Sequence, residues 1–134
     1  MYTEGTLSGK VIIITGSSKG IGRAVALRLA KSGASVVINF SSDQAPADEV
    51  VKEIGPDSAI AIKADVSKVE SVRSLVQQTI QRFGRLDSVV FNAGVGIYKG
   101  LTETTEEDFD RCYAINVKGP YFLAQVCLIL CIVF

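Results

Sequence analysis

The stretch that most constrains the fold is Thr15–Gly22, which reads Thr-Gly-Ser-Ser-Lys-Gly-Ile-Gly. It follows the apolar run 11–14 and precedes a segment whose apolar residues have helical spacing, so it predicts a turn between a buried strand and a helix. Glycine permits sharp turns and close approach to a ligand, and the N-terminus of a helix presents unpaired N–H groups to an anion. The stretch therefore predicts a phosphate-binding turn, with a tight turn that binds nothing as the alternative.

The surroundings of this turn make a dinucleotide site the better interpretation. Its glycine spacing differs from G-x-G-x-x-G by one inserted residue and a different order, so glycines alone would be weak support. A further apolar run at 35–39 completes a strand–helix–strand unit of about thirty residues, which is the context that such a site requires. The candidate cofactor-binding residues of the turn are Thr15, Gly16, Ser17, Ser18, Lys19, Gly20, Ile21 and Gly22.

Short apolar runs alternate with longer amphipathic segments along the whole chain. This alternation predicts an α/β fold with a parallel sheet covered on both faces. Right-handed crossovers then give an incomplete, Rossmann-type doubly wound sheet with strand order 3-2-1-4, in one domain over residues 1–134. The predicted strands are 11–14, 35–39, 59–64 and 86–91, and the predicted helices include 21–32 and 69–83.

Two helix starts carry the spacing of a capping box. Ser67 with Glu70 predicts the start of the helix at 69–83, and Thr104 with Glu107 predicts the start of a later helix.

The predicted sheet order also has a consequence for chemistry. The direction of winding reverses between the first and fourth strands, so Thr15–Gly22 and residues 92–94 should flank one crevice.

Composition narrows the possible functions. Basic and acidic residues balance at 14 each, so nothing indicates a nucleic-acid partner. The chain has no histidine, which excludes Ser-His and Cys-His nucleophile systems and His-ligated metal sites within it; we predict no metal site. The three cysteines lack C-x-x-C spacing, and residues 1–10 show no apolar leader, so we expect reduced thiols and a cytoplasmic protein.

Four motifs in order resemble those of the short-chain dehydrogenases/reductases. They are Thr15-Gly16-x-x-x-Gly20-x-Gly22, Asp65-Val66, Asn92-Ala93-Gly94, and Asn116 within Ile115-Asn116-Val117-Lys118-Gly119. The resemblance runs from about Leu7 to Gln125. Within the family it is greatest to ketoacyl-carrier-protein reductases and fungal polyketide ketoreductases.

The resemblance implies an NAD(P)-dependent oxidoreductase with a carbonyl or alcohol substrate, homo-oligomeric when intact. It implies that Asp65 with Val66 binds the adenine, and that Asn92, Ala93 and Gly94 lie near the ribose of the cofactor. It also implies that Asn116 supports a proton-relay water. Each assignment has a purely structural alternative: a helix-capping carboxylate, a turn without ligand contact, and a polar residue near a helix kink.

The choice of cofactor is argued from charge. Where an NAD enzyme usually has an acidic residue at the end of the second strand, this chain has Asn39, with Ser41 and Ser42 close behind. Lys19 adds a positive charge where a 2′-phosphate would sit. We therefore predict NADP(H), although Lys19 could be a solvated loop lysine and the nearby Asp43 keeps NAD open.

The family's proton donor is not found in this sequence. The family uses Asn, Ser and a Tyr-x-x-x-Lys set, in which lysine and the cofactor ribose lower the pKa of the tyrosine. Tyr2, Tyr98, Tyr113 and Tyr121 are followed four residues on by Thr6, Thr102, Val117 and Gln125.

The chain ends in an atypical apolar tail at 126–134, where the family has an amphipathic helix. Residues 121–134 are apolar except Gln125, but this run is shorter than the roughly twenty residues that span a bilayer, so a membrane anchor is not expected. We expect a truncated, alternatively spliced or mispredicted product. Three functions remain: the cofactor half of a reductase, a non-catalytic dinucleotide-binding or interaction fragment, and a membrane-associated or unfolded remnant.

Overall fold

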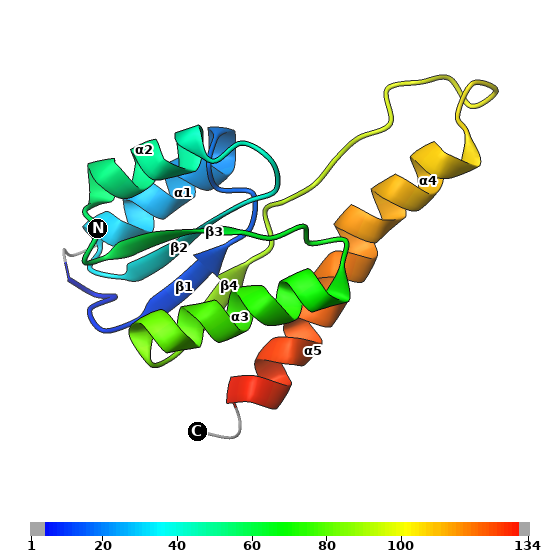
Figure 1. The fold of residues 1–134 in the computed structure, drawn as a ribbon. Coiled ribbons are helices and arrows are strands. Elements are labelled where there is room, and N and C mark those ends of the chain that lie inside the picture. Colours follow the sequence, from blue (N-terminus) through cyan, green and yellow to red (C-terminus); the bar gives the residue numbers. More distant parts are fainter. Residues whose placement is uncertain (1–4, 132–134) are drawn as a thin grey trace.

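The protein, described by a computed structural model over residues 5–131, has one four-stranded parallel sheet (Figure 1). The strand order is β3-β2-β1-β4, as predicted. Register pairs Ile13 of β1 with Val37 of β2 on one side and with Val89 of β4 on the other. The strands are β1 (Val11–Ile14), β2 (Ser35–Phe40), β3 (Ala59–Lys63) and β4 (Ser88–Val90).

Helices cover both faces of the sheet (Figure 1). The apolar residues of the strands alternate between the two faces, so Ile12 and Ile14 pack on the side of α1 and α2, and Ile13 packs on the side of α3 and α5. This alternation divides the core into two layers, one on each side of the sheet. The helices are α1 (Gly20–Lys31), α2 (Ala45–Ile54), α3 (Val69–Phe83), α4 (Glu106–Tyr113) and α5 (Gly119–Cys131), with a π-helical segment η1 (Ala114–Lys118) between the last two.

Both predicted capping boxes are wrong in position. The N-cap of α3 is Lys68, without a side-chain cap, because the Ser67 hydroxyl donates to Asp65 Oδ1 at 2.7 Å instead. The box of α4 lies one residue later than predicted. Thr105 Oγ1 accepts from the Asp108 N–H, and Asp108 Oδ2 accepts from the Thr105 N–H.

Strand β4 is shorter than the predicted run 86–91. At its start, the Asp87 carboxylate accepts from the Val11 N–H at 2.9 Å, and the Arg85 guanidinium binds the same carboxylate. At its end, the Asn92 N–H turns to Thr15 Oγ1, so the backbone leaves the sheet after Val90. Side-chain hydrogen bonds therefore set both ends of the strand.

The segments α4, η1 and α5 form one continuous helical arm that runs past the sheet (Figure 1). Only its C-terminal part packs on the core, where Leu123 and Val126 of α5 are buried with the residues of α3. Within residues 5–131 it is the single helix, Glu106–Leu130, whose 25 residues are long and apolar enough to cross a membrane. A core helix of a soluble protein passes the same test. Of the predicted tail at 126–134, residues 132–134 lie outside the described part.

Candidate cofactor site

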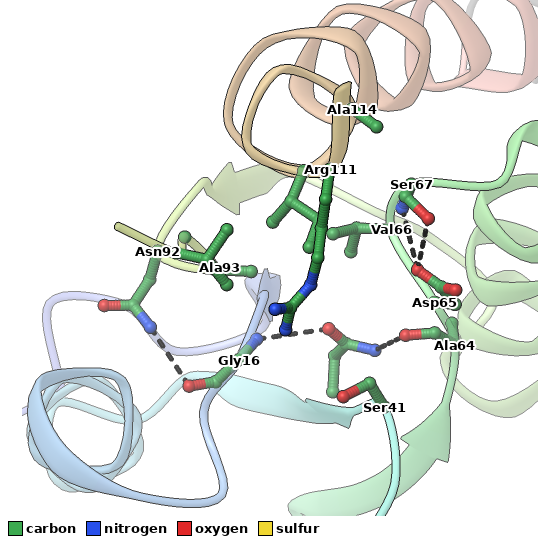
Figure 2. Close-up of a pocket in the computed structure, with 14 residues that line it drawn as sticks. Gly16, Ser41, Ala64, Asp65, Val66, Ser67, Asn92, Ala93, Arg111 and Ala114 are labelled. Atoms are coloured by element: carbon green, nitrogen blue, oxygen red, sulfur yellow. Dashed lines mark hydrogen bonds between the residues drawn. The ribbon is translucent and has the colours of Figure 1, made fainter. Parts of the chain in front are cut away.

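The largest constellation of predicted site residues surrounds one cavity of about 540 Å³ at the carboxyl edge of the sheet (Figure 2). This edge is where ligands bind in open α/β sheets, at the point where the direction of winding reverses. The cavity is lined by Gly16, Asn39, Ser41, Ala64, Asp65, Val66, Ser67, Asn92, Ala93, Gly94, Val95, Arg111, Ala114 and Ile115.

A hydrogen-bonded junction joins the turns after β1 and β4. Thr15 Oγ1 accepts from the N–H groups of Asn92 and Ala93, both at 3.0 Å. In return, Asn92 Nδ2 donates to the carbonyls of Thr15 and Gly16 at 2.9 and 3.0 Å. These bonds hold the two turns together at the base of the cavity, as the predicted sheet order requires.

Glycine is required where these turns touch. A Cβ on Gly22 would lie 2.5 Å from Asn92 Nδ2 and 2.6 Å from the Gly16 carbonyl oxygen. Gly16 itself has φ +62°, and a Cβ there would lie 3.1 Å from Ala93 Cα. The glycines thus bring helix α1 close to the end of β4, which places the first turn of the helix beside the cavity.

The start of α1 suits a phosphate group. The helix begins at Gly20 with no side-chain cap and no acidic residue in its first turn, so its N-terminal N–H groups are available to an anion. The side chain of Ile21 is 78% exposed there. Lys19 is also exposed and lies 3.8 Å from Asp43, outside the cavity lining.

Two predicted binding residues have their side chains engaged inside the fold. Ser17 is fully buried, and its hydroxyl donates to the Ile14 carbonyl and accepts from the Asn39 N–H. Asn39 is buried within β2, which extends one residue further than predicted. Its Oδ1 accepts from the Gly16 N–H, and its Nδ2 donates to the carbonyls of Ile62 and Ala64 at 3.3 and 3.1 Å.

Asp65 lies at the end of β3, on the cavity wall. Its Oδ1 accepts from both the side chain and the N–H of Ser67, at 2.7 and 3.0 Å. The Ser67 hydroxyl lowers the pKa of the Asp65 carboxyl below its usual value, with a further contribution from Lys68. Asp65 is therefore an ionised hydrogen-bond acceptor at neutral pH. Val66 follows Asp65 in the chain. Its carbonyl oxygen contacts Gly119 so closely that a Cβ on Gly119 would lie 2.5 Å from it.

Asn116 lies in the π-helical segment and faces a neighbouring hollow rather than the cavity. Its Oδ1 accepts from the Val95 N–H at 2.9 Å, and its Nδ2 donates to the Val95 carbonyl at 2.8 Å. The hollow, of about 550 Å³, shares Ala93, Gly94 and Val95 with the cavity. Asn116 thus fixes the segment that separates the two spaces.

The structure divides the predicted residues into three groups. Those that line the cavity are Gly16, Asn39, Ser41, Asp65, Val66, Asn92, Ala93 and Gly94. Those buried behind it are Thr15, Ser17 and Gly22. Those outside its lining are Ser18, Lys19, Gly20, Ile21, Ser42 and Asn116.

Sequence reasoning missed the contribution of the helical arm. Arg111, Ala114 and Ile115 line the cavity from one face of α4 and η1. Their i, i+3, i+4 spacing, leading up to Asn116, was the signal that could have identified them. Among residues 5–131, no group of three or more His, Cys, Asp or Glu side chains could hold a metal ion.

A family model for the short chain dehydrogenases matches residues 10–131. The chain belongs to the short chain dehydrogenase family. It is 49% identical over 125 residues to a hydroxynaphthalene reductase-like protein, Arp2, of Metarhizium anisopliae, covering 92% of this chain and 47% of the relative. It is 42% identical over 127 residues to the short chain dehydrogenase/reductase nsrJ of Aspergillus novofumigatus, covering 92% and 48%. These matches confirm the predicted family.

Solved structures of family members have the same fold. A 3-ketoacyl-(acyl-carrier-protein) reductase from Brucella melitensis, complexed with NADH, matches with TM-score 0.84 and 41% identity over 90% of this chain and 49% of that one. A short chain dehydrogenase from Burkholderia cenocepacia, in complex with NADP, matches with TM-score 0.87 and 37% identity over 91% and 51%. The chain spans about half the length of the curated relatives it matches.

Proposed function

We propose that this chain binds NADP(H) in the cavity at the carboxyl edge of the sheet. In this role it supplies the cofactor-binding half of an oxidoreductase that transfers hydride between NADP(H) and a carbonyl or alcohol. The observation that carries the proposal is that residues from the first three family motifs line this one cavity: Gly16 from the first, Asp65 and Val66 from the second, and Asn92, Ala93 and Gly94 from the third. Solved structures similar to this chain include complexes with NADH and with NADP, which supports a nicotinamide dinucleotide as the ligand.

The residues fit the parts of such a cofactor. The uncapped start of α1, with Ser18, Gly20 and Ile21, would take the pyrophosphate. The ionised Asp65, with Val66, would accept from the adenine amino group. Ser41 and Ser42, exposed after β2, would donate to a 2′-phosphate.

The opposite wall would take the nicotinamide half of the cofactor. Asn92, Ala93 and Gly94 would pass beside its ribose, since Gly94 has no side chain and a Cβ there would lie 3.3 Å from Asn116 Oδ1. The nicotinamide supplies the hydride chemistry. Asn116, held by Val95, would place its helix segment beside the reacting centre and support a proton-relay water.

A second candidate function is non-catalytic dinucleotide binding. None of the four tyrosines is followed four residues later by lysine, so this sequence does not carry the family's proton donor. We therefore expect the 134-residue chain to bind cofactor and to show no carbonyl-dependent consumption of NADPH. Turnover comparable to that of an intact reductase would favour the first function in full and contradict our conclusion that the proton donor is missing from this sequence.

We also propose a cytoplasmic location, a small-molecule carbonyl or alcohol substrate, and no nucleic-acid partner. The Cys112 thiol is not in a disulfide, which suits a reducing compartment. Exposed aromatic residues on the helical arm, such as Tyr113 and Tyr121, suit contact with a second copy in an oligomer.

Calorimetric titration of the chain with NADPH and NADH tests the proposal. Ile21→Asp places a carboxylate at the start of α1, which would stabilise the helix but repel a pyrophosphate. We expect it to weaken the binding of both dinucleotides by about tenfold or more. Leu101→Asp is the matched control, since Leu101 is also largely exposed and does not line the cavity. Absence of binding to the folded wild-type chain, or equal effects of the two variants, would overturn the proposal.

A further inference from the structure

One charged side chain reaches into the cavity from the helical arm. Arg111 lies in the last turn of α4, and Figure 2 shows its side chain extending across the cavity towards Gly16. Ser41, which directly follows β2, lies at the same side of the cavity (Figure 2). The guanidinium therefore points to the part of the site where a dinucleotide fold distinguishes a ribose 2′-hydroxyl from a 2′-phosphate.

The charge of this guanidinium is not compensated within the described part of the chain. Arg111 forms no side-chain hydrogen bond or ion pair with any residue from 5 to 131. Two carboxylates that line the cavity or precede Arg111 on α4 have other partners: Asp65 is bound by Ser67, and Asp108 is bound by Lys99 at 2.6 Å and by Thr105. Arg111 is thus a free planar donor group on the wall of the cavity.

Lys19, the cation expected from the sequence to favour NADP(H), is placed differently. Its ammonium lies 3.8 Å from the Asp43 carboxylate, and the residue does not line the cavity. Arg111 and Asp65 are the two charged residues among those that do. A guanidinium also matches phosphate better than an ammonium does, because it can donate two parallel hydrogen bonds.

We propose that Arg111, together with the hydroxyl of Ser41, binds the 2′-phosphate of NADP(H) and so sets the preference of this chain for the phosphorylated cofactor. The inference rests on the proposed dinucleotide function and adds a specificity residue to it. Stacking of the guanidinium on the adenine ring is the competing role. Stacking would contribute equally to NADPH and NADH, whereas a phosphate contact contributes to NADPH alone.

The test uses fragments that separate these roles. Calorimetry of the 134-residue chain measures the affinity for 2′,5′-ADP and for 5′-AMP, and then for NADPH and NADH. We expect Arg111→Ala to weaken 2′,5′-ADP and NADPH by about tenfold to a hundredfold, because it removes hydrogen bonds between charged groups. The affinities for 5′-AMP and NADH should stay within about twofold. Arg111→Lys keeps the charge without the paired donors, so its affinity for 2′,5′-ADP and NADPH should lie between those of the wild-type chain and Arg111→Ala.

Arg73→Ala is the matched control, since Arg73 is an exposed helical arginine on α3, away from the cavity. Lys19→Ala tests the alternative cation and should leave the ratio of the two affinities nearly unchanged. Circular dichroism verifies that each variant is folded. We expect the Arg111 variants to fold, because Arg111 is exposed.

The possible failures are distinguishable. Equal losses for 2′,5′-ADP and 5′-AMP in Arg111→Ala would assign stacking and overturn the phosphate contact, as would no loss at all. A loss of preference in Lys19→Ala alone would also overturn it. Wild-type chain that is folded yet binds none of the four nucleotides would overturn the proposed function itself, and this inference with it.

Discussion

The two walls of the cavity differ in how their polar groups are satisfied. On the sheet wall, the side chains of Thr15, Asn39 and Asn92 are all hydrogen-bonded to backbone groups of neighbouring strands and turns. On the helical wall, Arg111 is the charged residue, and its side chain has no partner within residues 5–131. The sheet wall is therefore part of what holds the fold together, whereas the helical wall offers groups that a ligand can use.

The same contrast holds for apolar residues. Those of β1 and β2 are buried on both faces of the sheet, whereas Phe109, Tyr113 and Tyr121 of the arm are more than half exposed. Substitutions in the sheet wall should therefore act mainly on folding, and substitutions in the helical wall mainly on binding. Single substitutions in each region test this division, and their expected effects fall from several kcal/mol to about one.

Asn39→Asp should have the largest effect on stability. The substitution replaces an amide that donates to the carbonyls of Phe40, Ile62 and Ala64 with a carboxylate that faces them, in a residue 2% exposed. We expect a loss of about 3–5 kcal/mol in the free energy of unfolding, as for an unpaired buried charge. Urea denaturation followed by circular dichroism measures it, with Asp43→Asn as the exposed control. If Asn39 instead faced the ribose, the variant would stay stable and shift its preference towards NADH.

Gly22→Ala should have the second largest effect on stability. The added Cβ would lie 2.5 Å from Asn92 Nδ2 and 2.8 Å from Ser17 Cα, so the two turns would have to separate. We expect a loss of about 3 kcal/mol by the same measurement. Gly100→Ala is the control, because the nearest atom to its Cβ is a flexible Glu103 oxygen at 3.7 Å. Equal stability of the two variants would show that the junction is looser than described.

Thr105→Ala should act on the arm alone. It removes the N-cap of α4 and should cost about 1 kcal/mol, as typical caps do. Thr104→Ala is the control, because Thr104 donates to the Gly100 carbonyl and caps no helix. Amide hydrogen exchange should show faster exchange in α4 and unchanged exchange in β1 and β2. Faster exchange in the sheet would contradict the independence of the two walls.

Acid should weaken the sheet through Asp87, at the edge opposite the cavity, with a smaller effect. The Arg85 guanidinium holds the pKa of Asp87 at about 2, below its usual value of 3.8. Since the folded-state pKa is depressed, the stabilisation is complete above about pH 4 and is lost as the pH falls towards 2. Asp87→Asn should flatten this dependence of thermal stability between pH 4 and 2. An unchanged slope would exclude Asp87 as its source.

The sheet order and the position of the cavity were predictable because they depend on local signals. The apolar runs mark the strands, and the turn 15–22 marks the edge at which a dinucleotide lies. The N-cap of α4 was not predictable from sequence. Thr104 and Thr105 are both suitable capping residues, and only the path of the preceding loop decides which of them caps the helix.

The roles of Asn39 and Arg111 depend on tertiary contacts that no local pattern carries. Asn39 seemed to end its strand, but β2 continues to Phe40, and the pleat then turns the amide between the Gly16 turn and β3. Arg111 resembles any surface arginine until the arm is placed over the sheet edge. The π-helical segment likewise ends at a tertiary contact, since it precedes Gly119, where a Cβ would lie 2.5 Å from the Val66 carbonyl oxygen.

The most direct measurement of the central proposal is an ¹⁵N–¹H NMR titration of the chain with NADPH. We predict saturable shifts concentrated on the amides of Gly16, Gly20, Gly22, Val66 and Ala93, with Arg111 and Ile115 following on the helical wall. Absence of shifts in the folded chain, or shifts confined to Gly96, Tyr98, Lys99 and Asp108, which line a neighbouring hollow but not the cavity, would contradict it.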